Sequence, residues 1–262
     1  MVLEKPGVHG PGGTRPFLCR ARYLPAFLTA LVVFAGMLLP APAQTPYPDP
    51  ADSSAWPGKG PIRLHPWMKD NRESFWRKRE KDRGAVVFVG SSMIANWKTL
   101  AKDLPELKVA NRGIGGDVSR GLLFRFQEDV LDLQPKAVVL AIGSNDLSAH
   151  ADPAVIVENI EAMIDQARAA RPDLPILLCS VAPRDGHSAP LKPGALEDFN
   201  ARLAELGRKK GLPVLDLRTA FGDAEGRPIA EFYAADRIHF SAAGYQKFAE
   251  VMRKQLTEMG LL

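Results

Sequence analysis

The sequence predicts an α/β protein in which a parallel sheet lies between two layers of helices. Short apolar runs alternate with longer helix-like segments along the C-terminal two hundred residues. These runs lack the period-two alternation of a strand with one solvated face, so they indicate strands buried on both faces. Prolines mark the expected helix-to-strand junctions, at Pro135, Pro172, Pro175 and Pro213.

The first 43 residues have the pattern of a secretory signal peptide. Arg15, Arg20 and Arg22 form a positive region, residues 24–39 are apolar and uncharged, and residues 41–43 read Ala-Pro-Ala, a small-residue cleavage pattern. The apolar stretch is shorter than the roughly 20 residues that span a membrane. We therefore expect a secreted or periplasmic protein, with an uncleaved N-terminal membrane anchor as the alternative.

Two further segments precede the first expected strand. Residues 44–62 are rich in Pro, Gly, Ser and Asp, which predicts a flexible linker. Residues 67–83 are charged but contain Trp67, Phe75 and Trp76, which is typical of an amphipathic helix lying on a domain. We place the folded domain at residues 63–262.

The rest of the domain accounts for a five-stranded sheet of flavodoxin-like type, with three layers in all. The expected strands are residues 85–89, 107–110, 137–142, 175–181 and 213–217. The expected helices are residues 92–102, 118–133, 153–170, 195–210 and 241–258, with Asp117, Asp152 and Ser241 as N-cap candidates.

Composition argues against nucleic acid as a partner and against a reactive cysteine. The signal segment holds four of the 34 basic and one of the 30 acidic residues, so the remaining chain has a formal charge near +1. No basic block with interleaved aromatic residues is present, and nucleic acid is not an expected partner. Cys179 is the one cysteine after the signal segment and sits in an expected strand, which favours an inert, packed thiol.

Three small polar turns follow the first three expected strands. They are Gly90-Ser91-Ser92, the segment 111–117 (Asn-Arg-Gly-Ile-Gly-Gly-Asp), and the segment 143–146 (Gly-Ser-Asn-Asp). Ligands of such sheets bind at the carboxyl ends of the strands, so the three turns are expected to face one crevice. Each turn alone is equally compatible with an ordinary β–α loop.

A fourth segment near the C-terminus supplies an acid and a base. Asp236 and His239 are three residues apart, so the carboxylate can accept the Nδ1–H of the imidazole. That contact fixes the tautomer and leaves Nε2 free to take a proton from a serine. The alternative is a polar turn before a helix capped by Ser241.

Together the four segments resemble the SGNH hydrolases, also called the GDSL-type esterase/lipase superfamily. The segment 111–117 with the following 121–126 looks most like the branch that holds the catalytic subunits of platelet-activating-factor acetylhydrolase Ib. The resemblance covers roughly residues 85–250 and implies the SGNH hydrolase fold. It also implies a serine esterase without a metal or cofactor, and no His-Glu-x-x-His motif, cysteine pair or spaced carboxylate cluster is present.

The resemblance also implies a role for each residue of the site. Ser92 would be the nucleophile, His239 the general base and then the general acid, and Asp236 the residue that orients His239. The backbone N–H groups of Ser92 and Gly116 and the side-chain amide of Asn145 would form the oxyanion hole.

The chain departs from the family at the residue before the nucleophile, where Ser91 replaces the usual Asp. This leaves Ser91 as a second candidate for the nucleophile. Ser144 in place of the more usual Thr is a mild change that removes no proposed chemical group.

The substrate is expected to be a small-molecule or carbohydrate ester with a short acyl group, acetyl first, because no long apolar insertion provides a lid for fatty chains. Arg184 and His187, in the loop after the fourth strand, are candidates for substrate contacts, with simple loop solvation as the alternative. A lysophospholipase or thioesterase and a catalytically silent binding domain remain alternative functions.

Overall fold

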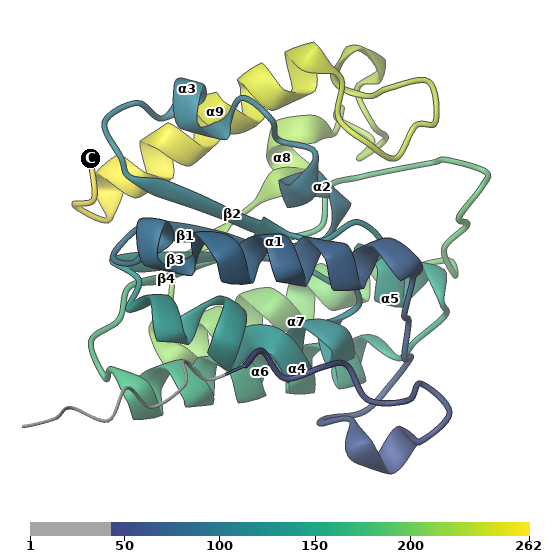
Figure 1. The fold of residues 1–262 in the computed structure, drawn as a ribbon. Helices are drawn as coiled ribbons and strands as arrows, with labels where there is room; N and C mark the ends of the chain where they lie inside the picture. Colours follow the sequence, from purple (N-terminus) through teal and green to yellow (C-terminus); the bar gives the residue numbers. More distant parts are fainter. Residues whose placement is uncertain (1–42) are drawn as a thin grey trace, which may run out of the picture. The chain divides into compact units, whose positions relative to one another are not determined.

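A computed structural model describes residues 43–262, which are built around one sheet of five parallel strands (Figure 1). The strands lie in the order β2-β1-β3-β4-β5, as in flavodoxin-like sheets, which confirms the predicted fold class. Their bounds are β1 Val86–Gly90, β2 Val109–Gly113, β3 Ala137–Ala141, β4 Ile176–Cys179 and β5 Val214–Leu215.

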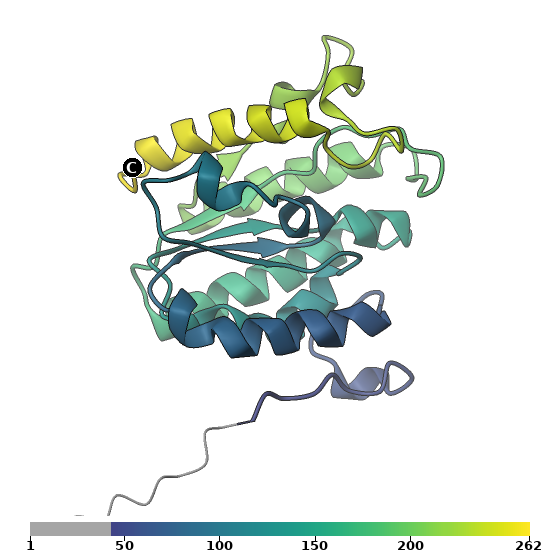
Figure 2. The ribbon, with the colours of Figure 1, turned by 45° about the horizontal axis from the view of Figure 1, so that its top comes forward.

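Helices cover both faces of the sheet, and the side chains of β1 show how. Val87 and Val89 enter one apolar core, whereas Val86 and Phe88 enter the other, so every residue of this strand is buried. The first core is closed by α4 Ser119–Asp129, α6 Pro153–Ala170 and α7 Ala195–Lys210, and the second by α2 Ser92–Ala95, α3 Leu100–Asp103, α8 Leu217–Phe221 and α9 Ala242–Glu258 (Figures 1 and 2).

The amphipathic helix expected at residues 67–83 is α1, Pro66–Asp82, which packs at the β2 edge of the sheet (Figure 1). Met68 and Phe75 bury their side chains with Ile114, which follows β2. At the other end of the helix, the Asp82 carboxylate accepts a hydrogen bond of 2.8 Å from Arg112 of β2. The short elements are α5 Ser144–Ser148 and the 3₁₀ helices η1 Ser53–Ala55, η2 Leu131–Leu133 and η3 Ala230–Phe232.

The helix expected at residues 92–102 is two short helices, α2 and α3, with a turn between them. The side-chain amide of Asn111 in β2 donates a hydrogen bond of 2.6 Å to the carbonyl oxygen of Ile94. Trp97 buries its ring, and its indole N–H donates to Asp103 at 2.7 Å. These tertiary contacts end the first helix, and the local hydrophobic periodicity of residues 92–102 does not predict them.

The segment 44–62 is packed on the domain, whereas its composition predicted a flexible linker. Its Trp56 is only 3% exposed and stacks on Tyr47 with ring centroids 5.7 Å apart. The guanidinium of Arg120 in α4 donates hydrogen bonds to the carbonyl oxygens of residues 53, 56, 57 and 60 at 2.7–3.2 Å. Arg120 thus holds the segment through its backbone carbonyls. The compact unit begins at Ala43.

The expected signal peptide lies almost wholly outside the described residues and stays a prediction. Between residues 43 and 262, no helix is long and apolar enough to cross a membrane. The same residues contain no group of three or more His, Cys, Asp or Glu side chains arranged to hold a metal ion. Cys179 is buried as expected, and this burial raises the pKa of its thiol to about 12.

Candidate active site

The turn after β1 holds Ser92 in a fixed position at the carboxyl edge of the sheet. Gly90 has φ +155°, and a Cβ atom there would lie 2.0 Å from the carbonyl oxygen of Ala141 in β3. Only glycine lets the two strands run this close together. The carbonyl oxygen of Gly90 accepts hydrogen bonds from Ile114 N–H at 3.0 Å and from the buried Arg125 at 3.3 Å. The turn is therefore tied to the β2 end as well as to β3.

Ser92, His239 and Asp236 form one continuous chain of contacts. The Oγ of Ser92 lies 2.8 Å from Nε2 of His239, and Nδ1 of the same ring lies 2.6 Å from Oδ2 of Asp236. With the proton on Nδ1, that nitrogen donates to Asp236 and Nε2 accepts the serine hydroxyl. The arrangement is that of a serine nucleophile, its base and an orienting carboxylate.

Asp236 is held as an anion by the turn it belongs to. Desolvation raises its pKa, but hydrogen bonds from the His239 ring and from the backbone N–H groups of His239 and Ile238 outweigh it and lower the pKa to about 2. The intervening Arg237 has a left-handed φ of +58°, and its guanidinium makes two hydrogen bonds of 2.8 and 2.7 Å to Asp185. This ion pair fixes the strained turn that presents the acid and the base together.

Ser91 does not reach the histidine in this arrangement. Its side chain is buried, and its backbone N–H donates to the carbonyl oxygen of Ala141 at 3.4 Å. The hydroxyl within hydrogen-bond distance of His239 is that of Ser92. The geometry thus favours Ser92 over Ser91 as the nucleophile.

The three donors expected for the oxyanion hole are all available. Asn145 donates one amide hydrogen to the carbonyl oxygen of Asp117 at 2.9 Å, which leaves its second hydrogen for another acceptor. Within residues 43–262, the backbone N–H groups of Ser92 and Gly116 have no protein acceptor. Gly116 does not line the pocket beside Ser92. Its loop is joined to the turn before Ser92 by the hydrogen bond from Ile114 N–H to the carbonyl oxygen of Gly90.

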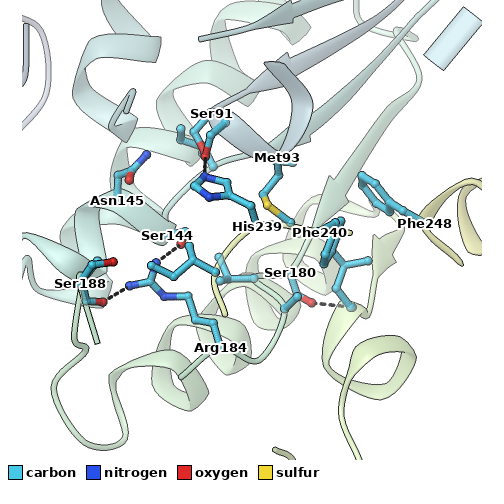
Figure 3. A pocket seen from close by; sticks show the side chains of 18 residues that line it. Ser91, Met93, Ser144, Asn145, Ser180, Arg184, Ser188, His239, Phe240 and Phe248 are labelled. Atoms are coloured by element: carbon cyan, nitrogen blue, oxygen red, sulfur yellow. Dashed lines mark hydrogen bonds between the residues drawn. The ribbon is translucent and has the colours of Figure 1, made fainter. Parts of the chain in front are cut away.

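A pocket of about 240 Å³ opens beside Ser92 and His239 (Figure 3). Its walls come from the carboxyl ends of β1, β3 and β4 and from the turn before α9. They are mostly small or apolar, and they include Met93, Ile142, Val181, Ile238 and Phe240. This volume lies below the range of roughly 300–1,000 Å³ that is typical of sites for drug-sized ligands.

Arg184 lies in this pocket, whereas His187 does not. The Arg184 guanidinium donates to the hydroxyl of Ser144 at 3.2 Å (Figure 3). It also donates to the hydroxyl of Ser148 at 2.7 Å. Burial lowers its pKa, which the charge of Asp236 opposes. His187 is exposed and lines a separate hollow formed by residues of the 184–197 segment.

A buried ion network beneath the site escaped the sequence analysis. Asp117, expected as a helix N-cap, instead pairs with Arg125 at 2.8 Å, because Asp146 accepts the hydrogen bonds from the Ser119 N–H that begins α4. Arg125 also contacts Asp129 at 3.3 Å. The i,i+4 spacing of Arg125 and Asp129 is visible in the sequence, but it is also typical of a solvated helix face. The Asp152 and Ser241 caps are confirmed.

Known proteins share the sequence pattern and the fold. The model of the GDSL-like Lipase/Acylhydrolase family matches residues 88–247. The human platelet-activating factor acetylhydrolase IB subunit alpha2 is 27% identical over 206 residues, covering 74% of this chain and 84% of that protein. An acetylxylan esterase of Geobacillus stearothermophilus is 23% identical over 192 residues, covering 69% of this chain and 87% of that protein.

Among solved structures, a GDSL-like lipase from Bacteroides thetaiotaomicron superposes with a TM-score of 0.62 at 22% identity. The match covers 74% of this chain and 96% of that one. At this level of identity the likeness is one of fold.

Proposed function

The chain belongs to the GDSL-like lipase/acylhydrolase family and is a carboxylic ester hydrolase, and on that premise we propose that it is a secreted esterase for acetyl and other short-chain esters. The observation that carries the proposal is the Ser92–His239–Asp236 chain, with contacts of 2.8 and 2.6 Å, beside a pocket of about 240 Å³. The alcohol portion that we propose is an O-acetylated carbohydrate, which the acetylxylan esterase among the relatives supports.

The mechanism is a two-step acyl transfer. Ser92 attacks the ester carbonyl while Nε2 of His239 takes its proton, and the oxyanion accepts hydrogen bonds from Ser92 N–H, Gly116 N–H and the Asn145 amide. His239 then protonates the leaving alcohol. Water, activated by the same imidazole, releases the acid from Ser92. Asp236 stays ionised throughout and stabilises the imidazolium that forms twice per cycle.

The test is hydrolysis of p-nitrophenyl esters from acetyl to octanoyl by the mature protein, with Ser92→Ala and Ser91→Ala in parallel. We expect activity on acetyl that falls with chain length and is lost in Ser92→Ala but retained in Ser91→Ala. Loss only in Ser91→Ala would overturn the assignment of the nucleophile. A rate that rises toward octanoyl would favour a lipase or lysophospholipase instead.

Export is a separate part of the proposal and has its own test. Expression of the full chain in a bacterium, followed by N-terminal sequencing of the exported protein, is expected to give a start at Gln44. A chain that keeps its N-terminus and sediments with membranes would support the uncleaved anchor.

A further inference from the structure

Trp67 reaches the peptide group on which one of the proposed oxyanion donors depends. The carbonyl oxygen of Gly115 and the N–H of Gly116 belong to the same peptide unit. The indole N–H of Trp67, in the first turn of α1, donates a hydrogen bond of 2.8 Å to that carbonyl oxygen. Because a trans peptide directs its N–H opposite to its C=O, this contact leaves the Gly116 N–H pointing away from Trp67.

We infer that Trp67 is a positioning residue for the oxyanion hole, acting through the Gly115–Gly116 peptide. The inference rests on the proposed function, since it requires the Gly116 N–H to be an oxyanion donor. A hydrogen bond to the carbonyl oxygen holds the peptide plane and polarises the group, which makes the opposite N–H a stronger donor. That N–H has no other protein acceptor in the described part of the chain.

The indole itself is held in place by neighbouring groups of the N-terminal segment. The ring of His65 stacks on that of Trp67, with centroids 4.3 Å apart and planes 13° from parallel. His65 also packs against Gly116, where a Cβ atom would lie 2.9 Å from the imidazole. The Gly115–Gly116 peptide therefore contacts both His65 and Trp67. Because both of its residues are glycines, it has no side chain of its own that fixes its orientation.

Exposure indicates that burial is not the reason for a tryptophan at this position. Trp67 is 48% exposed and is the one exposed large apolar side chain among residues 43–262. A residue that served only the packing of α1 would place its apolar surface inward, as Met68 and Phe75 do. Trp67 contributes to the loop the indole N–H that donates to the carbonyl oxygen of Gly115.

The neighbouring carbonyl oxygens of the same loop are held in the same way. Arg63 donates to the carbonyl oxygen of Gly116 at 3.4 Å, and Asn145 donates to that of Asp117 at 2.9 Å. Three successive peptides thus have their carbonyl oxygens fixed by side chains from outside the loop. Trp67 is the donor whose peptide carries the proposed oxyanion N–H.

The test removes the indole N–H from Trp67 in two variants, of which one keeps an aromatic ring and one does not. Trp67→Phe and Trp67→Leu are compared with wild type for p-nitrophenyl acetate hydrolysis, with Trp76→Phe as the matched control on the same helix. Trp76 donates no hydrogen bond from its indole within the described residues, and the Arg79 guanidinium lies over its ring. We expect kcat to fall about 3- to 10-fold in both Trp67 variants, as for one lost hydrogen bond, with KM unchanged. Trp76→Phe should match wild type.

A transition-state analogue separates this role from a structural one. Methylboronic acid forms a tetrahedral adduct on a catalytic serine, and its inhibition constant should rise by the factor by which kcat/KM falls. Thermal melting should change little, because Trp67 is half exposed. Wild-type kcat in Trp67→Phe with a loss only in Trp67→Leu would show that the ring acts, and would overturn the inference. So would a rise in KM alone.

Failure of the proposed function gives a different result from failure of this inference. If Ser92→Ala retains activity, the nucleophile is wrong and the oxyanion argument falls with it. If Ser92→Ala is inactive while both Trp67 variants turn over like wild type, the proposed function stands and Trp67 has no positioning role.

Discussion

Asn145 fixes its position with one amide hydrogen and keeps the other available. Its contact with the Asp117 carbonyl oxygen orients the side chain in the absence of substrate, which is the preorganisation that the proposed oxyanion hole requires. Asn145→Ala removes the donor that this arrangement preserves. We expect kcat to fall about 100- to 1,000-fold for p-nitrophenyl acetate, since loss of one oxyanion donor raises the barrier by about 2.7–4 kcal/mol.

The control for Asn145→Ala is a test of whether the variant is folded, by circular dichroism and thermal melting. The variant should stay folded, because the amide is only partly buried and bonds a loop carbonyl. Turnover near that of wild type in a folded Asn145→Ala protein would contradict a three-donor oxyanion hole.

In the proposed mechanism, Asp236 acts on catalysis by orienting His239 and stabilising its charged form. In Asp236→Asn the amide can accept the Nδ1–H through its oxygen or impose the other tautomer through its nitrogen, and it carries no charge to stabilise the imidazolium. We expect a fall in kcat on the order of 1,000-fold or more with little change in KM. Stopped-flow acylation and steady-state kinetics would measure both parameters.

The low pKa of Asp236 adds a statement about pH. A depressed carboxyl pKa means that the anion, and the interactions it makes, persist as pH falls until about 2 is reached. Protonation of Asp236 therefore should not set the acid limb of activity between pH 4 and 7.

A changed KM with unchanged kcat in Asp236→Asn would be incompatible with the orienting role.

At the scale of single residues, short-range contacts could be predicted and long-range ones could not. Asp236 and His239 are close in sequence, and the backbone N–H groups of residues 238 and 239 bond the same carboxylate oxygen. By contrast, the hydrogen bond between Trp67 and Gly115 joins residues 48 positions apart and depends on how α1 lies against β2. No local pattern in residues 63–67 predicts this hydrogen bond.

At the scale of elements, the segment 44–62 has a role that its composition conceals. Proline and glycine limit the regular structure of the segment to the short 3₁₀ helix η1, but Trp56 and Arg120 still bind it to α4. Arg120→Ala would remove the side-chain donor from four carbonyl oxygens, of which, within the described residues, only that of Ser53 keeps a hydrogen bond, from the Trp56 N–H. We expect a loss of about 2 kcal/mol of stability and faster proteolytic cleavage within residues 44–62.

Arg171→Ala is the control for this experiment. Arg171 also donates to two backbone carbonyl oxygens, those of residues 135 and 136, but these lie before β3. Cleavage sites in both variants would be mapped by mass spectrometry after brief trypsin treatment. Equal protection of the 44–62 segment in Arg120→Ala and wild type would mean that the arginine does not hold it.

The regular elements themselves were predictable where their signal is local. The strand ends lie within three residues of their expected positions, and α6 and α7 have the expected bounds, because apolar runs and prolines mark their ends. The helix expected at 92–102 is broken, because Asn111 takes the carbonyl of Ile94 and Trp97 turns into the core. That break places Ser92 in a helix of one turn, fixed by β2 and β3.

For the whole molecule, the strand order explains why distant loops form one site. β1 lies between β2 and β3, so the turn at Ser92 has the Gly116 loop on one side and the Asn145 turn on the other. The turn before α9 lies at the same edge (Figure 2), and its His239 contacts Ser92. The sequence predicts this convergence once the sheet is known to be parallel, since all carboxyl ends then share an edge.

The stability of the whole domain should depend on pH through Asp146, next to Asn145. Desolvation raises the pKa of this fully buried carboxyl to about 7, against the hydrogen bonds that it accepts from Ser119 and with a contribution from the charge of Asp117. A raised pKa means that the native state holds a proton that the unfolded chain, with a pKa of 3.8, has lost. The contribution of Asp146 to stability is therefore complete below pH 3.8 and disappears as pH rises through about 7.

Asp146→Asn tests this dependence, because the amide stays neutral while its oxygen still accepts from Ser119. The free energy of unfolding of wild type minus that of Asp146→Asn should fall on the order of 1 kcal/mol per pH unit between pH 5 and 7. Guanidinium unfolding of both proteins at pH 5, 6, 7 and 8 gives the difference directly, and changes at other titrating groups cancel in it. A difference that stays constant with pH would show that Asp146 is ionised in the native state throughout, held as an anion by its hydrogen bonds from Ser119.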